Sequence, residues 1–101
     1  MNELVKQVEQ WSFNKGLHLA DSSKQFLKVV EETGEVAAAL ARHDKDALID
    51  GIGDVVVTLI ILAQQNGLEL EQCLQFAYDE IKGRTGKMVD GVFVKSSDLT
   101  E

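Results

Sequence analysis

The sequence predicts an all-α fold: a four-helix antiparallel bundle-like domain that ends in a short C-terminal β-hairpin or extended tail and assembles as an oligomer. The 101 residues include no proline and are 45% hydrophobic. Their apolar side chains recur at the three- and four-residue spacing of amphipathic helices. A chain of this length forms one domain with a modest core, so residues 1–101 are taken as a single helical domain. The helices are expected at about residues 2–15, 22–42, 44–66 and 69–83, with a tail at 84–101.

The first helix carries an apolar stripe that includes Leu4 and Val8, and Gly16 is its expected stop. Trp11 lies at the end of that stripe. Its ring either packs in the core or at an interface, or stacks on a nucleobase at the edge of a pocket. Trp11 is therefore a candidate substrate-binding residue.

The second helix is expected to begin at Ser22, because Ser22-x-x-Gln25 resembles a capping box, and to run to about Arg42. On a helix, Gln25 and Lys28 share a polar flank beside the apolar face. These two side chains lie one or two turns before a group of glutamates, so they are candidates for contacts with a base, a sugar or phosphates.

Three glutamates, Glu31, Glu32 and Glu35, project from two successive turns of this helix. They border the apolar stripe instead of opposing it, and no Lys or Arg follows them at four-residue spacing, as on a salt-bridged exposed face. A solvated acidic face is the alternative interpretation. The pattern favours a binding site.

The third helix is capped by Asp44 and ended by Asn66-Gly67. Its first turns carry Asp50 and Asp54, four residues apart, and the run 55–63 that follows is apolar. A helix with almost no polar face is expected to be surrounded by its own chain and by a partner subunit. A carboxylate that enters such a core needs an ion pair or a metal, so Asp54 is a candidate functional residue.

Two acidic helices joined by a tight turn are antiparallel neighbours, so their carboxylates can converge on one point. Converging carboxylates repel unless a cation lies between them. Hard oxygen ligands suit Mg²⁺, with Mn²⁺ as a possible substitute, and do not suit zinc or copper.

The fourth helix has its apolar residues at Leu70, Cys73, Leu74, Ala77, Tyr78 and Ile81. The apolar position of Cys73 predicts a buried thiol. One cysteine excludes a disulfide framework within the chain and makes a reducing compartment the default.

Asp79 and Lys82 flank this helix, and Lys82, Arg84 and Lys87 form a basic cluster in an acidic protein. The cluster either balances a helix dipole or holds phosphate oxygens. Farther on, Asp90-Gly91 lies between β-branched and apolar residues, which indicates a short hairpin.

The formal net charge of −7 argues against binding to nucleic acid, since no basic stripe is present to neutralise its phosphates. The nine-residue apolar run 55–63 is far shorter than the roughly 20 residues that span a bilayer. The first residues show no export signal. A cytoplasmic location without membrane contact is expected.

The segments Glu31-Glu32-Thr33-Gly34-Glu35 and Asp50-Gly51-Ile52-Gly53-Asp54, with Gln25 before them and Lys82-x-Arg84-x-x-Lys87 behind, resemble the MazG-like, all-α nucleoside triphosphate pyrophosphohydrolases. The resemblance covers roughly residues 11–95. The family often writes its second acidic pair as E-x-x-D, whereas Gly51 stands three residues before Asp54 in this chain. Asp50 is the candidate replacement for the missing ligand. The number of metal ions in the site stays open.

The resemblance implies Mg²⁺-dependent hydrolysis of a (deoxy)nucleoside triphosphate at its α-phosphorus, with release of a monophosphate and pyrophosphate. It also implies a homo-oligomer, either a dimer or a dimer of dimers. Glu32 or Glu35 would act as the catalytic base. The candidate metal ligands are Glu32, Glu35, Asp54 and Asp50, with Glu31 as the alternative. The candidate substrate-binding residues are Gln25, Lys28, Trp11, Asp79, Lys82, Arg84 and Lys87.

A non-catalytic helical module that binds a nucleotide or a protein is the competing interpretation, and the missing acid at Gly51 is its best argument. A di-iron bundle would need Glu-x-x-His on two helices, and neither His18 nor His43 follows a glutamate by three residues. The preferred base and sugar stay open.

Overall fold

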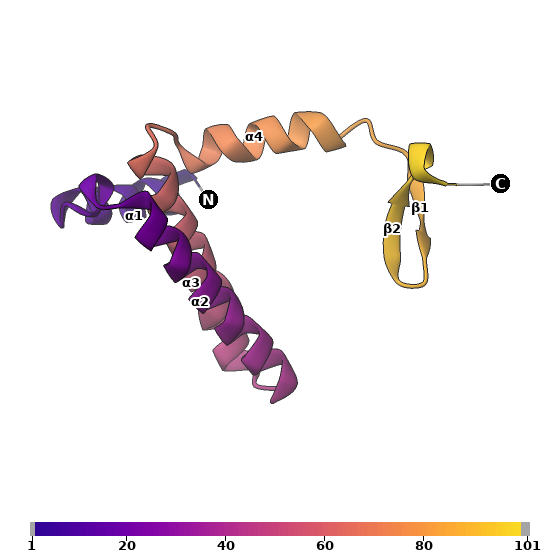
Figure 1. Cartoon of the computed structure of the whole chain (residues 1–101), viewed down its shortest axis with the longest axis horizontal. Helices are drawn as coiled ribbons and strands as arrows, with labels where there is room; N and C mark the ends of the chain where they lie inside the picture. Colours follow the sequence, from indigo (N-terminus) through magenta and orange to yellow (C-terminus); the bar gives the residue numbers. More distant parts are fainter. Residues whose placement is uncertain (1, 100–101) are drawn as a thin grey trace. The chain divides into compact units, whose positions relative to one another are not determined.

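The computed structural model describes residues 2–99. It contains four α-helices and a two-stranded hairpin (Figure 1), which confirms the predicted mostly helical fold with a short C-terminal hairpin. The chain divides into two compact units, Met1–Glu71 and Gln72–Glu101. In chain order the elements are α1 (Asn2–Asn14), the 3₁₀ turn η1 (Leu17–Leu19), α2 (Ser22–Ala41), α3 (Lys45–Gln65), α4 (Leu70–Ile81), β1 (Gly86–Val89), β2 (Val92–Lys95) and the 3₁₀ turn η2 (Ser96–Asp98). Within residues 2–99, none of the helices combines the length and apolar character that a bilayer crossing requires.

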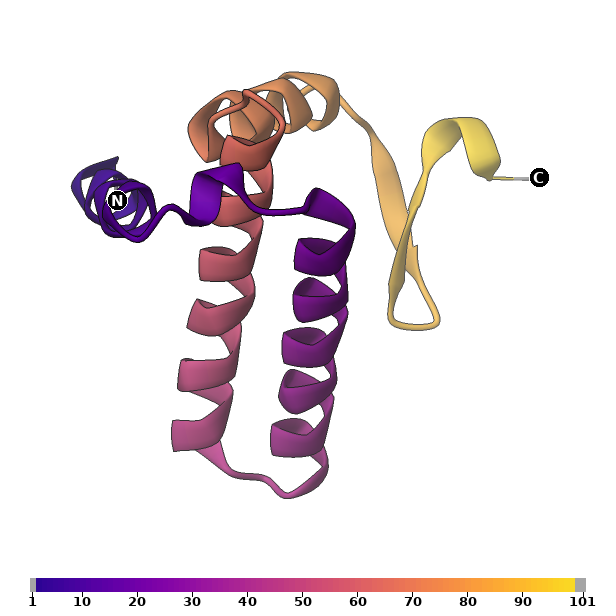
Figure 2. The same ribbon diagram turned by 60° about the vertical axis from the view of Figure 1, so that its left-hand side comes forward.

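The first unit is built on α2 and α3, which lie side by side as an antiparallel helical hairpin (Figure 2). The turn between them depends on Asp44, whose backbone N–H donates to Ala39 O at 3.1 Å and closes α2. The Asp44 carboxylate accepts a hydrogen bond of 3.0 Å from the Ala47 N–H and opens α3. The predicted cap at Asp44 is therefore confirmed, and the tight turn makes the two helices neighbours.

The start of α2 differs from the prediction. Its cap is Asp21, whose carboxylate accepts a 2.8 Å hydrogen bond from the Ser23 N–H. The proposed capping box from Ser22 to Gln25 is wrong, because the carboxylate one residue earlier takes the capping role. The Gln25 side chain points across to α3 instead, where its Nε2 donates to Thr58 O at 3.1 Å.

The core of the first unit lies along α3, which packs against α2 and against α1. Two glutamine amides at the C-terminal end of α3 hold the N-terminal segment: Gln64 Nε2 donates to Glu9 O at 3.1 Å, and Gln65 Nε2 donates to Leu17 O at 3.0 Å. Helix α3 then ends at Gln65, with Asn66 as its C-terminal cap, as predicted. The buried apolar residues are Val5, Ala39, Ile60, Ile61 and Ala63.

The second unit has no comparable core, since none of the described residues 72–99 is buried. The Cys73 thiol is exposed, so the predicted buried thiol is wrong for the single chain. The apolar spacing predicts the helix α4 correctly, but such spacing does not supply a surface for the helix to pack against.

The hairpin forms as predicted. Strands β1 and β2 pair antiparallel from Gly86↔Lys95 to Val89↔Val92. The two turn residues have positive φ angles, 51° at Asp90 and 80° at Gly91, as a two-residue type I′ turn requires.

Candidate active site

The candidate site lies on the facing sides of α2 and α3. Glu32 on α2 and Asp54 on α3 are both half-buried, whereas Glu31 and Glu35 on α2 are exposed. The two half-buried carboxylates come from helices that the short turn at Asp44 makes antiparallel neighbours. The structure therefore brings acids from both predicted segments to one side of the helical hairpin.

The electrostatics of Glu32 show which carboxylates act on one another. Partial burial raises the pKa of the Glu32 carboxyl above its ordinary value, and the negative charges of Asp54, Glu31 and Glu35 raise it further. The ammonium of Lys28 opposes this shift. A pKa raised by acids on two helices means that their charges converge on Glu32.

Asp50 has a different position from the other acids. It is exposed and is not among the charges that shift the pKa of Glu32. Its role as a replacement ligand stays a prediction.

Gly51 occupies the position where the resembling family often carries an acid. It is buried, and a Cβ built on it would lie 3.1 Å from Val36 Cγ2 of α2, closer than ordinary van der Waals contact. The missing side chain therefore lets α2 and α3 approach closely beside the acids. An acid at this position would have to displace Val36.

The donor set suits one class of metal ion. Its members are all carboxylate oxygens, which Mg²⁺ and Mn²⁺ prefer, and they repel one another in the absence of a cation. Among residues 2–99, no group of three His, Cys, Asp or Glu side chains is close enough to hold a metal ion as it stands. The chemistry of the donors fits Mg²⁺, while binding would have to draw the carboxylates together.

Lys28 is paired on the flank of α2. Its Nζ lies 3.8 Å from Glu31 Oε2, and both side chains are exposed. Such a pair is weak, so the ammonium can leave Glu31 for a stronger anion.

Trp11 lines a small apolar hollow of about 280 Å³ next to α3, together with Leu4, Val8 and Val57. The indole is 48% exposed, and the Lys15 ammonium lies 5.5 Å from the ring centroid. Val57 follows Asp54 by one helical turn, so this hollow opens close to the carboxylates along α3.

A wider hollow of about 710 Å³ lies at the other end of α3, where Phe13 stacks on His18 at 4.5 Å between ring centroids. It is also lined by Gln64, ten residues after Asp54 and thus roughly 15 Å along the helix. None of the candidate metal-ligating carboxylates lines this hollow, so it is not the candidate active site.

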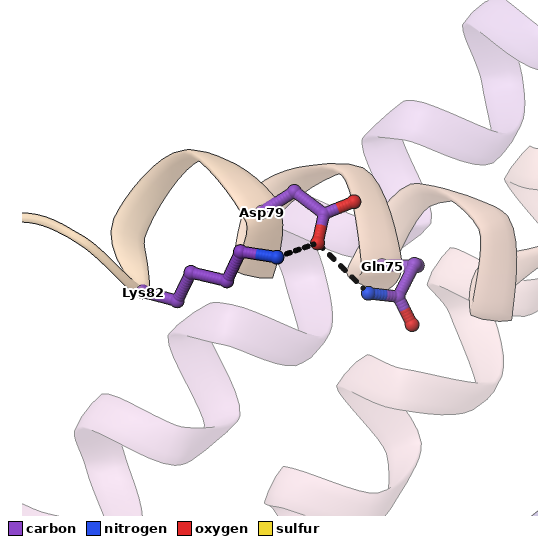
Figure 3. Close-up of polar contacts among 3 residues, drawn as sticks. All are labelled: Gln75, Asp79 and Lys82. Carbon is purple, nitrogen blue, oxygen red and sulfur yellow. Dashed lines mark hydrogen bonds and ion pairs between the residues drawn. The ribbon is translucent and has the colours of Figure 1, made fainter.

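The remaining candidates belong to the second unit. Figure 3 shows that Asp79 on α4 lies between two partners: its Oδ1 accepts a hydrogen bond from Gln75 Nε2 at 3.1 Å and pairs with Lys82 Nζ, also at 3.1 Å. The Lys82 ammonium, which follows the last residue of α4, is thereby already paired with a carboxylate of that helix. Lys87 lies on β1, opposite Val94.

Arg84 follows α4 and lines an open hollow of about 430 Å³ with Lys95 and the hydroxyl-bearing Thr85, Ser96 and Ser97, and the acidic Glu80 lines it as well. Guanidinium, ammonium and hydroxyl groups are the donors that bind phosphate oxygens. Lys95 is the residue here that sequence reasoning missed. The pairing of Gly86 with Lys95 in a hairpin of known turn type could have brought it next to the basic cluster.

Sequence reasoning also missed Thr58 and Val36, which contact the opposite helix beside the acids. Both lie at core-facing positions, where a helix period predicts burial but not the partner.

The protein-family comparison found a match between residues 21–89 and the model of the MazG nucleotide pyrophosphohydrolase domain. The matched segment contains all five candidate carboxylates. An uncharacterized 18.2 kDa protein in the rep-hol intergenic region of Haemophilus phage HP1 (strain HP1c1) is 39% identical over 71 residues, which cover 68% of this chain and 43% of that protein. The chain thus matches less than half of the length of that relative. No solved structure matches the chain.

Proposed function

The chain belongs to the MazG nucleotide pyrophosphohydrolase family, and on that premise we propose that it is a Mg²⁺-dependent nucleoside triphosphate pyrophosphohydrolase. The observation that carries the proposal is the coupling of Glu32 on α2 to Asp54 on α3, inside the segment that the family model matches. Structural acids on a solvated face would not converge from two helices.

The proposed reaction is hydrolysis of a ribo- or deoxyribonucleoside triphosphate. The oxygen of a water molecule attacks the α-phosphorus, and the bond from that phosphorus to the oxygen bridging the α- and β-phosphates breaks. Pyrophosphate leaves with the electron pair, and the water proton passes to a carboxylate. The products are a nucleoside monophosphate and pyrophosphate.

Glu32 is the best candidate for the base in this reaction, with Glu35 as the alternative. A raised pKa makes the Glu32 carboxylate a better proton acceptor than an ordinary glutamate, because partial burial and then the neighbouring acids disfavour its charged form. Glu32, Glu35 and Asp54, with Asp50 or Glu31 as a further ligand, would hold Mg²⁺, which when bound would neutralise phosphate charge.

The nucleoside end of the substrate would lie against Trp11. The apolar hollow beside this indole is lined by Val57, which is three residues after Asp54 and so roughly 4.5 Å farther along α3. A base stacked on the indole would thus lie within a nucleotide's length of the carboxylates. Gln25 and Lys28 would be the nearest polar groups on α2.

The phosphate end needs cations in a protein of net charge −7. Arg84, Lys82 and Lys87 are the proposed partners of the leaving pyrophosphate, and the hollow that Arg84 shares with Lys95 supports this role. Asp79 would partly neutralise the Lys82 ammonium through their ion pair and so weaken its attraction for phosphate.

We further propose that the protein is a homodimer or a dimer of dimers and acts in the cytoplasm. The second unit supports self-association, because it exposes large apolar side chains without burying any of its described residues. Examples are Phe76, 72% exposed, and Met88, 64% exposed.

The test is a panel of ribo- and deoxyribonucleoside triphosphates incubated with the purified protein and Mg²⁺, with and without EDTA. Chromatography separates the nucleotide products, and a coupled assay distinguishes pyrophosphate from orthophosphate. We expect pyrophosphate and a monophosphate in equal amounts, loss of both with EDTA, and loss of both in Asp54→Asn. Orthophosphate and a diphosphate as products would contradict attack at the α-phosphorus.

A second candidate function is a non-catalytic nucleotide-binding module. It is favoured by Gly51, which contacts Val36 where the family often has an acid, and by the failure of any three carboxylates within the described part of the chain to form a ready metal site. Nucleotide binding measured by calorimetry, without product in the panel above, would decide for this candidate.

A further inference from the structure

A side-chain hydrogen bond crosses from α2 to α3 close to the carboxylates. Gln25 Nε2 donates to Thr58 O at 3.1 Å, and the bond is partly buried. Thr58 is only 9% exposed, and its own hydroxyl donates to Val55 O at 2.7 Å, so the whole residue is fixed within α3. We name the bond between Gln25 and Thr58 the amide clasp.

The amide clasp lies on the same faces as the acids. Thr58 follows Asp54 by four residues, which places the two side by side on successive turns of α3. Gln25 precedes Glu32 by seven residues, two turns earlier on the same face of α2. The amide clasp is therefore a contact between α2 and α3 that lies next to Glu32 and Asp54 along both helices.

A second contact lies on the other side of the acids. There Gly51 allows Val36 to approach α3, with only 3.1 Å from Val36 Cγ2 to the Cβ that Gly51 lacks. Along α3, Asp54 lies between Gly51 and the clasp. Along α2, Glu32 lies between the clasp and Val36. The two coupled acids are thus bracketed by one polar and one close-packed contact.

The Val36 contact and the amide clasp constrain different features of the helix pair, namely the distance between the helices and their alignment along the axis. Apolar packing is non-directional, so the contact at Val36 sets how closely the helices approach but resists sliding only weakly. A partly buried hydrogen bond has a preferred length and angle, so it resists sliding of one helix along the other. The clasp is the directional contact at this part of the helix pair.

We infer that Gln25 is a positioning residue, whose amide clasp sets the axial register of α2 against α3 and thereby holds Glu32 opposite Asp54. The inference rests on the proposed function and assigns Gln25 a role other than contact with the nucleotide. Its action on the acids passes through the helix backbone, since the Gln25 amide is bonded to α3.

The experiment compares two glutamines that each bond a backbone carbonyl across the first unit. Gln25→Met keeps the length of the side chain and removes the donor. Gln65→Met does the same to the bond with Leu17 O at the far end of α3, eleven residues from Asp54. Circular dichroism first establishes that both variants are folded.

Calorimetric titration with Mn²⁺ alone, without nucleotide, is the main readout. Because groups that orient metal ligands typically change affinity by 10–100-fold, we expect Gln25→Met to bind Mn²⁺ about tenfold more weakly and Gln65→Met to match the wild type. In turnover assays the kcat of Gln25→Met should fall while KM for the triphosphate stays near the wild-type value. Gln25→Asn, which keeps the amide but shortens the side chain, should behave like Gln25→Met.

Two results in the variants would overturn the positioning role. One is unchanged Mn²⁺ affinity in Gln25→Met with a raised KM, which would mean that Gln25 touches the nucleotide. The other is an equal loss of affinity in Gln65→Met, which would mean that any weakened contact in this unit loosens the site. A wild-type protein without Mn²⁺ affinity would overturn the inference as well, whereas Mn²⁺ binding without pyrophosphate release would overturn only the proposed hydrolase.

Discussion

Both units of this chain contain amphipathic helices, but only in the first unit do the apolar faces pack against another helix. In the first unit, the short turn at Asp44 returns the chain at once, so α3 lies against α2 and residues such as Ala39 and Ile60 are only 1% exposed. In the second unit, residues 72–99 include no buried side chain. A segment of about 30 residues that consists mainly of one helix and a two-stranded hairpin is too small to build a core of its own.

The difference separates two kinds of functional group. The coupled carboxylates belong to the first unit, which is held together by contacts between its own helices. Their arrangement is therefore a property of the single chain. The basic residues belong to the unit that exposes its apolar side chains, so their arrangement depends on what covers those side chains. Changes in the first unit should therefore act on chemistry and intrinsic stability, and changes in the second on self-association and substrate affinity.

The strongest test of the first unit is Glu32→Gln, which keeps the shape of the side chain and removes its charge. We expect turnover to fall at least about a hundredfold, the usual range for loss of a general base, with the helical circular dichroism spectrum unchanged. Glu3→Gln, the same change on α1 at an acid that is not among the charges acting on Glu32, is the matched control and should retain full activity. A folded Glu32→Gln variant with wild-type turnover would remove Glu32 from the mechanism.

Two glycines in one turn of α3 test the close approach of the helices. Gly51→Val would force a branched side chain against Val36 and should lower the free energy of unfolding by about 2 kcal/mol, a typical cost of overpacking. Gly53→Ala meets nothing within 4 Å and should raise it by about 1 kcal/mol through helix propensity. Urea denaturation measures both. Equal effects of the two changes would mean that α2 does not constrain Gly51.

Local signals made much of this fold predictable from the sequence. Asp44 predicts a helix cap because its carboxylate can reach the N–H groups of the next turn. Asp90-Gly91 predicts a turn because few other residue pairs tolerate two positive φ angles. The convergence of Glu32 and Asp54 followed from the period of each helix and from the short connection between them. These inferences need only contacts near in sequence.

Long-range partners could not be read in the same way. The acceptor of Gln25 is a backbone carbonyl, which has no residue-type signature, so only the packing of α2 on α3 reveals it. Cys73 lies in a correctly predicted apolar stripe of α4 but is exposed. An apolar stripe identifies one side of a helix, but it does not identify which part of the protein packs against that side. Between Asp21 and Ser22, both good caps, the choice depends on the backbone angles of the preceding loop.

The second unit is tested by a charge on its apolar face. Leu74, 54% exposed on α4, should lie in the self-association surface, so Leu74→Asp should weaken self-association about tenfold or more, since burying a leucine contributes roughly 1.5–3 kcal/mol. Sedimentation velocity over a range of concentrations measures this. Leu19→Asp on η1, 81% exposed in the first unit, is the matched control and should leave the association constant unchanged. Equal weakening by both changes would contradict the division between the units.

The pH dependence of stability tests the coupling of the acids without any turnover. Because folding raises the pKa of Glu32, the folded protein retains a proton that the unfolded chain releases just above the ordinary glutamate pKa. The metal-free protein should therefore lose stability as the pH rises through that range. Glu32→Gln removes this loss of stability, so the Tm of the variant should exceed that of the wild type at neutral pH. The difference in Tm should shrink as the pH falls below the ordinary glutamate pKa. A variant with a lower Tm than the wild type at neutral pH would mean that Glu32 is held by a favourable partner.

The smallest expected effect concerns the ion pair on α4. Asp79→Asn should change the free energy of unfolding by no more than about 0.5 kcal/mol, because Asp79 and Lys82 are both about half exposed to water. The same change frees the Lys82 ammonium, so KM for a triphosphate should fall by about twofold if Lys82 holds phosphate oxygens. Gln75→Met is the control, since it removes the other hydrogen bond to Asp79 and leaves the ion pair in place. A rise in KM in Asp79→Asn alone would reverse the assignment, because it would mean that the carboxylate itself, and not the lysine that it neutralises, contacts the substrate.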